Sequence, residues 1–343
     1  MSGGSILITG ANGGLGTAFV TELLRSSHGA ECYGIFTVRN PEGASNIHRI
    51  LEEASALHKH ELFPLDLISL DSIRSSARTL NQRVATGHVP RIRALVLSAA
   101  VQHVDGTKST GDGFESHFAV NYLANFLFVL LILQSMDKEH GRIIMISTAM
   151  HDSTHWMNKG TWPVGMKEMY TTTERVSRGG GLGNEVGCLG EIIGMRQYGA
   201  SKMFLVMFAY ELQRRLDQDS TLSKISVLSM DPGGMGGAEL TKRGSPISRF
   251  IWSHIMPTVQ NASVYIWSNG VLRTHEKSAR DLLRACFDRK DLGEHPKAMF
   301  LNGSAQSMSS DESRDEKNQR RLWTESLVLV GLEDGQTMLE NWR

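Results

Sequence analysis

A tyrosine and a lysine four residues apart, Tyr198 and Lys202, are the side chains of this sequence best suited to acid–base chemistry. On a helix, positions i and i+4 share one face, so the two side chains would be neighbours. A free phenol, with a pKa of about 10, is too weak an acid to deliver a proton at neutral pH. A lysine ammonium beside it favours the phenolate and lowers that pKa. The pair therefore predicts proton exchange with a substrate oxygen.

A glycine-rich segment near the start of the chain, Thr9 to Gly16, supplies the second chemical signal. It follows a short apolar run and opens an amphipathic stretch, so a strand would lead into it and a helix would leave it. In this context backbone N–H groups at the helix N-terminus can hold a pyrophosphate, although glycine in an ordinary turn is the alternative. The segment predicts a dinucleotide site with contacts from Thr9, Gly10, Asn12, Gly13, Gly14, Leu15 and Gly16.

Three glycines of this segment have distinct predicted roles. Gly10 permits the tight turn, Gly14 the close approach of phosphate, and Gly16 the close packing of helix on strand. The positive charge of an oxidised nicotinamide would add to that of Lys202 in lowering the pKa of Tyr198. Together the two segments predict redox chemistry with a nicotinamide cofactor.

The end of the second predicted strand distinguishes between the two nicotinamide cofactors. Residues 37–41 contain no acidic side chain for the adenosine ribose hydroxyl, and they offer Arg39 instead. Because a guanidinium pairs with a 2′-phosphate, NADP(H) is favoured over NAD(H), with a solvated surface arginine as the alternative. Asp66, followed by Leu67, either accepts a hydrogen bond from the adenine amino group or caps the helix that begins near Ser69.

Short apolar or β-branched runs alternate with helical stretches, which is typical of βαβ units on a parallel sheet. The predicted strands are Ser5–Thr9, Tyr33–Val38, Leu62–Leu65, Ala94–Ser98, Arg142–Ser147, Ile225–Met230 and Ala298–Leu301. Helical periodicity is found in Leu15–Arg25, Ser69–Leu80, Phe114–Gln134, Tyr198–Leu216 and Ser278–Phe287. We expect one α/β domain over residues 1–343, a Rossmann-type doubly wound fold with a mainly parallel seven-stranded sheet flanked by helices.

Three segments do not follow this alternation. Residues 149–196 contain Trp156, Trp162, several methionines and a glycine run, and a loop of this length is uncommon unless it is a lid, a binding loop or disordered. We expect a substrate lid whose apolar side chains line a pocket rather than merely pack on the sheet. Residues 244–267 are expected to form a second substrate-side segment that contains a helix. Residues 309–343 form a C-terminal extension with a helix that is charged at first and packed later.

Composition argues against several classes of partner. The 36 Lys and Arg equal the 36 Asp and Glu, so no nucleic acid partner is expected. Three widely spaced cysteines offer neither a disulfide framework nor a CxxC site, which favours a reducing compartment. No export signal is visible, and the most apolar run, Leu123–Leu133, is too short for a membrane span, so we expect a cytoplasmic protein. The pairs His151/His155 and His58/His60 lack a third ligand, so no metal is expected.

From about residue 5 to about residue 331 the chain resembles the short-chain dehydrogenase/reductase family. The TGxxxGxG and YxxxK motifs of that family are matched by the glycine-rich segment and by Tyr198 and Lys202, and its serine and asparagine by Ser147 and Asn121. Within the family, the retinol dehydrogenase and protochlorophyllide reductase-like branch, which mostly prefers NADP(H), is the most similar. Outside the glycine-rich segment the expected cofactor contacts are Arg39, Asp66, Leu67, Ser98, Ala99, Ala100, Asn121, Tyr198, Lys202, Pro232, Gly233 and Met235.

The resemblance implies a mechanism that agrees with the residue types. Tyr198 exchanges the proton with the substrate oxygen while Ser147 hydrogen-bonds to it. Lys202 holds the nicotinamide ribose and lowers the pKa of Tyr198, and Asn121 positions a water that returns the proton. Hydride moves directly to or from the nicotinamide ring.

The sequence departs from the family pattern near two of these positions. The residues at 98–100 are Ser-Ala-Ala, where the family usually has Asn-Ala-Gly. Ser147 lies 51 residues before Tyr198, several times the common spacing. Its assignment depends on its place at a strand end, and Thr148 and Ser153 are the alternatives.

We therefore expect an NADP(H)-dependent oxidoreductase that interconverts a ketone or aldehyde and an alcohol on a bulky lipophilic substrate, such as a secondary-metabolite intermediate. Reduction of a conjugated double bond and a non-catalytic NADP(H)-binding regulatory protein are the alternatives. Family members commonly dimerise through the helices at 114–134 and 198–216, so the resemblance implies a homodimer or homotetramer.

Overall fold

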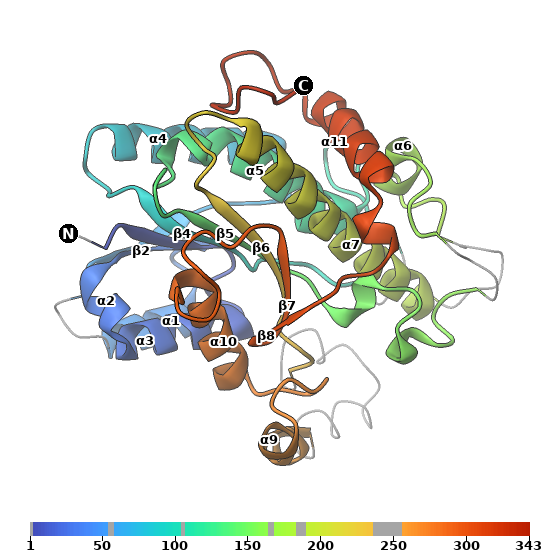
Figure 1. Ribbon diagram of the computed structural model, residues 1–343, viewed down its shortest axis with the longest axis horizontal. Helices are drawn as coiled ribbons and strands as arrows, with labels where there is room; N and C mark the ends of the chain where they lie inside the picture. Colours follow the sequence, from blue (N-terminus) through green and yellow to red (C-terminus); the bar gives the residue numbers. More distant parts are fainter. Residues whose placement is uncertain (1–2, 54–57, 104–106, 164–167, 183–189, 236–255) are drawn as a thin grey trace.

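The computed structural model describes residues 3–53, 58–103, 107–163, 168–182, 190–235 and 256–343. Within these residues an eight-stranded sheet crosses the molecule in the order β3-β2-β1-β4-β5-β6-β7-β8 (Figure 1). The strands are β1 (Ser5–Ile8), β2 (Tyr33–Val38), β3 (His60–Pro64), β4 (Ile92–Leu97), β5 (Arg142–Ile146), β6 (Ser226–Asp231), β7 (Met299–Asn302) and β8 (Ala305–Ser307). All neighbours are parallel except β7 and β8. The doubly wound α/β fold is confirmed.

The sequence predicts seven strands, and the structure corrects this number with β8, which pairs antiparallel with β7. Gly303, at a φ of 62°, lies in the tight turn between the two strands, and Asn302 pairs with Ala305. All three residues of β8 are exposed. Because a strand without a buried side has no alternation of apolar and polar residues, the sequence carries no signal for it.

Helices cover both faces of the sheet (Figure 1). One face is covered by α4, α5 and α7, the other by α1 and α10, and a separate cluster of buried apolar side chains lies on each side. Their bounds, with those of the peripheral helices, are α1 (Gly14–Arg25), α2 (Ser27–Glu31), α3 (Ser45–Glu52), α4 (Leu70–Ala85), α5 (Ala124–Ile132), α6 (Thr173–Ser177), α7 (Gly190–Gln218), α9 (Met256–Ile266), α10 (His275–Phe287) and α11 (Glu316–Val330). Because both faces are covered, β1, β5 and β6 are buried throughout.

The stretch predicted as one helix over Phe114–Gln134 consists of three helical pieces. A π-helical turn, Phe118–Leu123, leads into α5, and a 3-10 turn follows. Such π-turns are rare and are frequent at functional sites, and this one contains Asn121. By length and composition Phe118–Ser135 is the one described helix that would pass for a membrane span, and 94% of it is buried inside the fold, so it is weak support for a span.

The C-terminal extension packs on α5 and α7 through α11, the predicted helix. Trp323 is 1% exposed, and its ring centroid lies 5.2 Å from that of Phe126 and 5.8 Å from that of Phe208. Its Nε1 donates a hydrogen bond of 2.7 Å to the carbonyl oxygen of Trp342. Every residue of α5 is buried, and Trp323 of α11 covers part of it through the contact with Phe126.

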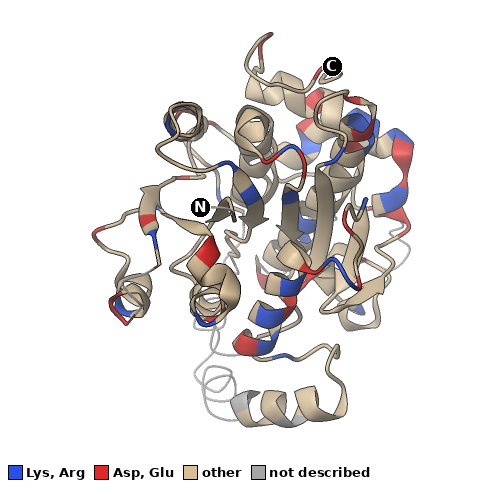
Figure 2. Ribbon diagram, turned by 60° about the vertical axis from the view of Figure 1, so that its left-hand side comes forward, with Lys and Arg blue, Asp and Glu red and all other residues tan. Residues whose placement is uncertain are grey.

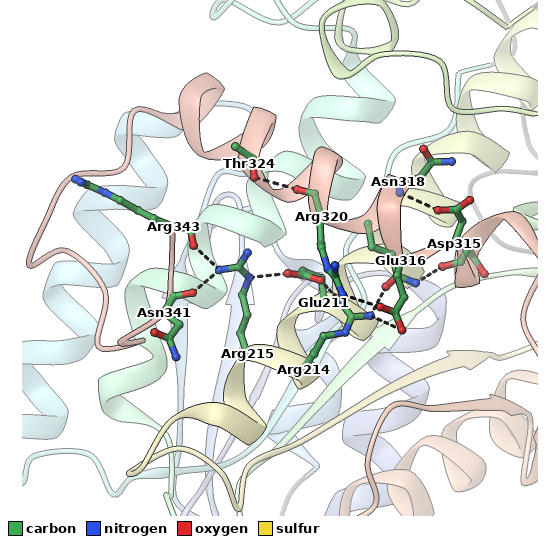
Figure 3. A network of polar contacts seen from close by, with 12 residues as sticks. Glu211, Arg214, Arg215, Asp315, Glu316, Asn318, Arg320, Thr324, Asn341 and Arg343 are labelled. Carbon is green, nitrogen blue, oxygen red and sulfur yellow. Dashed lines mark hydrogen bonds and ion pairs between the residues drawn. The ribbon is translucent and has the colours of Figure 1, made fainter.

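A polar network borders this apolar contact (Figure 3). Glu211 on α7 is 3% exposed and pairs with Arg214 and with Arg215, whose Nε lies 2.7 Å from the carboxylate. Arg215 also donates to the main-chain oxygens of Asn341 and Arg343. Two guanidinium groups therefore compensate the buried carboxylate while one of them fixes the end of the chain.

α11 lies on the helices through which the resemblance implies self-association. A dimer that used the same faces of α5 and α7 would require α11 to leave them. The homodimer or homotetramer stays a prediction.

Replacing Trp323 by Ala is expected to lower the free energy of unfolding by about 3–5 kcal/mol, because a large side chain is removed from a packed interface. Val328 lies on the same helix and is 78% exposed, so Val328→Ala should change the free energy of unfolding by no more than about 0.5 kcal/mol. Urea denaturation of the three proteins measures both values. Equal stability of the two variants would show that α11 is not packed on α5 and α7.

Candidate active site

Tyr198 and Lys202 lie on the turn of α7 that faces the carboxyl end of β5. Lys202 is 2% exposed, and its Nζ donates a hydrogen bond of 2.8 Å to the carbonyl oxygen of Ile146, the last residue of β5. The same Nζ lies 5.8 Å from the centre of the Tyr198 ring. Burial lowers the pKa of Lys202 to about 8. The two side chains are thus neighbours, as their spacing predicts.

Ser147 follows β5 directly and reaches the same turn. Its side chain is 2% exposed, and Oγ donates a hydrogen bond of 3.4 Å to the carbonyl oxygen of Lys202. The alternative, Thr148, uses its hydroxyl to cap the short 3-10 turn Ala149–His151. The structure therefore places the Ser147 hydroxyl against the Tyr–Lys turn, whereas the Thr148 hydroxyl is used in the cap.

Asn121 reaches the Tyr–Lys turn from the π-helical turn before α5. Its Oδ1 accepts a 2.8 Å hydrogen bond from the N–H of Val101, and its Nδ2 donates to the carbonyl oxygen of Val101 at 3.0 Å. Nδ2 also lies 3.0 Å from Oγ of Ser201, which in turn donates to the carbonyl oxygen of Tyr198. Asn121 thus ties the loop after β4 to α7.

The pKa of Tyr198 is raised in the chain by itself, not lowered. Burial of the phenol is the main cause, and the negative charge of Asp231 at the end of β6 adds to it. The predicted lowering of this pKa by Lys202 is therefore not found in the protein alone. At neutral pH Tyr198 is a phenol, which is the proton-donating form.

The glycine-rich turn is packed directly on the end of β4. Oγ1 of Thr9 accepts hydrogen bonds of 3.0 Å from the N–H groups of Ser98 and Ala99. Gly10 has a φ of 72°, and a Cβ there would lie 2.9 Å from Cα of Ala99. The Ser-Ala-Ala variant of this loop thus keeps its backbone pairing with the turn, and Gly10 is required both by conformation and by space.

Two further glycines have a different spatial reason. A Cβ on Gly16 would lie 2.3 Å from the carbonyl oxygen of Gly10, so Gly16 allows the turn to fold onto itself. A Cβ on Gly14 would lie 2.7 Å from Nε2 of His275, so in the protein alone the space predicted for phosphate approach borders this imidazole.

The predicted adenosine side is shaped by Asn12 and Arg39. Oδ1 of Asn12 accepts a 3.1 Å hydrogen bond from the N–H of Ile47, which joins the glycine-rich turn to α3. Arg39 follows β2, is exposed, and has no hydrogen bond or ion pair with any residue that the structure describes. Its guanidinium is free to pair with an anion.

The structure contradicts one of the two alternatives for Asp66, the cap of α4, and the contact with the adenine amino group stays a prediction. Ser69 caps α4 by accepting a hydrogen bond from the N–H of Ser72. One carboxylate oxygen of Asp66 accepts from the N–H of Ile68, which shapes the turn after buried Leu67.

The predicted nicotinamide side, Pro232 to Met235, is held by α10 and the residue before its cap. Arg273 is 1% exposed and donates a 2.8 Å hydrogen bond to the carbonyl oxygen of Asp231, while Oγ of Ser278 donates to that of Pro232 at 2.7 Å. Neither residue is predicted from the sequence as part of the site, because the contacts join positions 42 and 46 residues apart and no local motif marks them.

The predicted substrate lid is described except for residues 164–167 and 183–189. Part of it packs inward, with Met169 and Tyr170 buried, while Trp156 is 64% exposed. The C-terminal extension holds the inward part: Glu312 accepts 2.7 Å hydrogen bonds from the N–H groups of Met169 and Tyr170. Glu325 similarly accepts one of 2.9 Å from the N–H of Thr173. Of the second predicted segment, 244–255 lies outside the described residues, and the rest contains α9.

The histidines considered as metal ligands have other partners. Nδ1 of His151 faces the carbonyl oxygen of Thr148, and Nε2 accepts from the N–H of Ser310. His58 contacts the carbonyl oxygen of Gly29. In the described part of the chain no three His, Cys, Asp or Glu side chains gather into a group that could hold a metal ion.

A dinucleotide fits these residues. A cradle of glycines lies at the carboxyl end of a parallel sheet, and the Arg39 cation and the buried Nε2 of His275 have no partner among the described residues. Together they offer groups for an extended anionic ligand. The fold and the site define a Rossmann-type protein of the dinucleotide-binding class.

Comparisons with known proteins agree with this class. Residues 5–157 match the family model described as short chain dehydrogenase. A protein of Talaromyces variabilis named short-chain dehydrogenase iccH is 40% identical over 99% of both chains, and human retinol dehydrogenase 13 is 26% identical over 96% of this chain and 86% of its own. The structure of NADPH-bound carbonyl reductase from chicken fatty liver shares the fold, with a TM-score of 0.58, 17% identity, and coverage of 89% of this chain and 98% of that one. The chain belongs to the short-chain dehydrogenase family of oxidoreductases.

Replacing Lys202 by Met is expected to stabilise the cofactor-free protein at pH 7. The pKa of Lys202 falls from 10.5 to about 8 on folding. Below pH 8 the buried charge therefore lowers the free energy of unfolding, and this destabilisation decreases as the pH rises toward 10.5. That shift corresponds to about 3 kcal/mol, from which the lost hydrogen bond to Ile146 takes about 1 kcal/mol.

Urea denaturation of both proteins at pH 7 and pH 9.5 checks this. The variant should be more stable by about 2 kcal/mol at pH 7, and the difference should shrink at pH 9.5. A difference that does not change with pH would contradict the buried charge.

Proposed function

We propose that the protein is an NADP(H)-dependent oxidoreductase that interconverts a ketone or aldehyde and an alcohol on a bulky lipophilic substrate. The observation that carries the proposal is the convergence on one turn of α7. Lys202 and Ser147 meet there at the end of β5, Asn121 arrives through Ser201, and the phenol of Tyr198 is on the same turn. A protein that only bound the cofactor would need the glycine-rich turn but not this acid.

In the proposed mechanism Tyr198 donates its phenolic proton to the substrate oxygen during reduction and takes it back during oxidation. Ser147 hydrogen-bonds to the same oxygen. Lys202 holds the nicotinamide ribose, and its ammonium stabilises the phenolate left after proton transfer. Asn121 positions a water that returns the proton to Tyr198. When bound, the nicotinamide supplies or accepts the hydride.

The state of Tyr198 favours the reductive direction in this proposal. Because burial and Asp231 raise its pKa, the side chain holds a proton at neutral pH before a substrate arrives. Oxidation of an alcohol would need the phenolate, and the positive charge of an oxidised nicotinamide is then the main force that lowers this pKa.

NADP(H) is proposed over NAD(H) because Arg39 is unpaired among the described residues where an adenosine 2′-phosphate would lie. The NADPH-bound relative in fold is consistent with this choice.

A lipophilic substrate is proposed from the surface on the same side as the nicotinamide loop. Gln260 of α9 donates to the carbonyl oxygen of Gly234, so α9 lies beside that loop. α9 contains no Lys, Arg, Asp or Glu, and its ribbon has no blue or red in Figure 2. Tyr265, Ile266 and Trp267 at its end are 96%, 88% and 71% exposed. The name of retinol dehydrogenase 13, a relative over most of its length, specifies a lipophilic alcohol.

Tyr198→Phe is the test of the proposed function. NADPH should raise the melting temperature of the wild type and of the variant alike, because a ligand that binds only the native state stabilises it. Turnover, followed as NADPH oxidation with a panel of bulky aromatic and terpenoid ketones and aldehydes, should fall by a factor of about 100 or more in the variant. A binding protein without turnover would bind NADPH and show no Tyr198-dependent oxidation with any substrate.

Arg39→Met is expected to weaken NADPH binding about tenfold, since a charge-assisted contact to the phosphate is lost, and to leave NADH binding unchanged. Arg78 is an exposed arginine on α4, and Arg78→Met serves as the control for a general loss of positive charge. Isothermal titration of the three proteins with both cofactors measures this. Equal affinity of Arg39→Met and the wild type for NADPH would remove Arg39 from the site.

A further inference from the structure

The N-terminal end of α10 lies between the two predicted cofactor loops. Toward the nicotinamide loop, Ser278 donates to the carbonyl oxygen of Pro232, and the N–H of Arg273 donates to that of Gly234 at 2.9 Å. Toward the glycine-rich turn, α10 packs along α1 and brings His275 against Gly14. One short segment, residues 273–278, therefore contacts both ends of the cradle.

In segment 273–278 the Arg273 side chain leaves its Nε unpaired but donates hydrogen bonds through its other two nitrogens, whereas the His275 side chain makes no hydrogen bond to any described residue. Its Nε2 is buried and makes no hydrogen bond to any described residue. Most buried polar atoms have a partner, because leaving one unpaired costs free energy. Nε2 lies 2.7 Å from the place where a Cβ of Gly14 would be, so the unpaired nitrogen is directed at the first turn of α1.

The first turn of α1 offers no carboxylate to this nitrogen. Gly13, its N-cap, provides no side-chain hydrogen bond, and the turn contains no acidic residue. The free N–H groups of such a turn attract an anion. A phosphate held there would supply the acceptor that Nε2 lacks.

We propose, on the basis of the NADP(H) site above, that His275 is a cofactor-binding residue whose Nε2–H donates a hydrogen bond to the pyrophosphate. This contact lies outside the glycine-rich motif and comes from a residue far along the chain. Since the same segment holds Pro232 and Gly234, it joins the phosphate contact to the nicotinamide loop.

His275→Phe and His275→Gln test the contact by binding alone. Phe keeps a ring without a donor, whereas Gln keeps an N–H near the position of Nε2. By isothermal titration, His275→Phe should bind NADPH about tenfold more weakly than the wild type, and His275→Gln should retain most of the affinity. All three should bind adenosine 2′-monophosphate equally, because it lacks the pyrophosphate. His88, exposed after α4, provides the control His88→Phe.

The results distinguish a failure of the His275 contact from a failure of the proposed function. His275 makes no specific pyrophosphate contact if His275→Phe binds NADPH like the wild type. The same conclusion follows if its affinity for adenosine 2′-monophosphate falls as much as its affinity for NADPH. In both cases the proposed NADP(H) site is unaffected. If the wild type binds neither NADPH nor NADH, the proposed function fails and the inference with it.

A measurement on the wild type keeps the inference falsifiable if His275→Phe does not fold. In protein labelled with ¹⁵N-histidine, the Nε2 resonance of His275, assigned by its absence in His275→Gln, should move on addition of NADPH and stay in place with adenosine 2′-monophosphate. An unchanged resonance at saturating NADPH would overturn the contact.

Discussion

The hydrogen bond from the Lys202 ammonium to the carbonyl oxygen of Ile146 is the constraint on which the site depends. It joins the middle of α7 to the end of β5, inside the fold and away from water. A charge in such a place is costly, as the lowered pKa of Lys202 shows. This destabilising charge lies on the turn that also bears Tyr198, and active sites are often less stable than the rest of a fold because their function requires it.

The elements around this turn shield it from water and hold it in position. The π-helical turn before α5 packs on α7 and presents Asn121, and α11 packs on α7 and contacts α5 through Trp323 and Phe126. The glycine-rich turn and the nicotinamide loop reach the same sheet edge from other strands, and the segment at the start of α10 connects them. Parallel strands make this possible, because their carboxyl ends meet at one edge whatever their distance in the sequence.

The sequence predicts those features that depend on local order along the chain. The glycine-rich turn, the Tyr198–Lys202 pair and seven strands follow from spacing and periodicity, and the structure has them where they are expected. Local rules fail where two partners compete: Ser69, not Asp66, caps α4, because its hydroxyl is the one in reach of the Ser72 N–H. They also fail for Arg273 and His275, whose roles arise from contacts with loops far away in the sequence.

The two glutamates of the C-terminal extension have a consequence for the order in which the molecule is completed. Glu312 and Glu325 bind the backbone of residues 169–173, and these contacts join positions 142 to 152 residues apart. A growing chain folds from its N-terminus as it is synthesised. The sheet and both predicted cofactor loops precede these glutamates in the sequence, so residues 169–173 of the predicted lid receive these contacts only when almost the whole chain has left the ribosome. A chain cut short before Glu312 would contain every residue of the proposed chemistry and lack the groups that hold residues 169–173 in place.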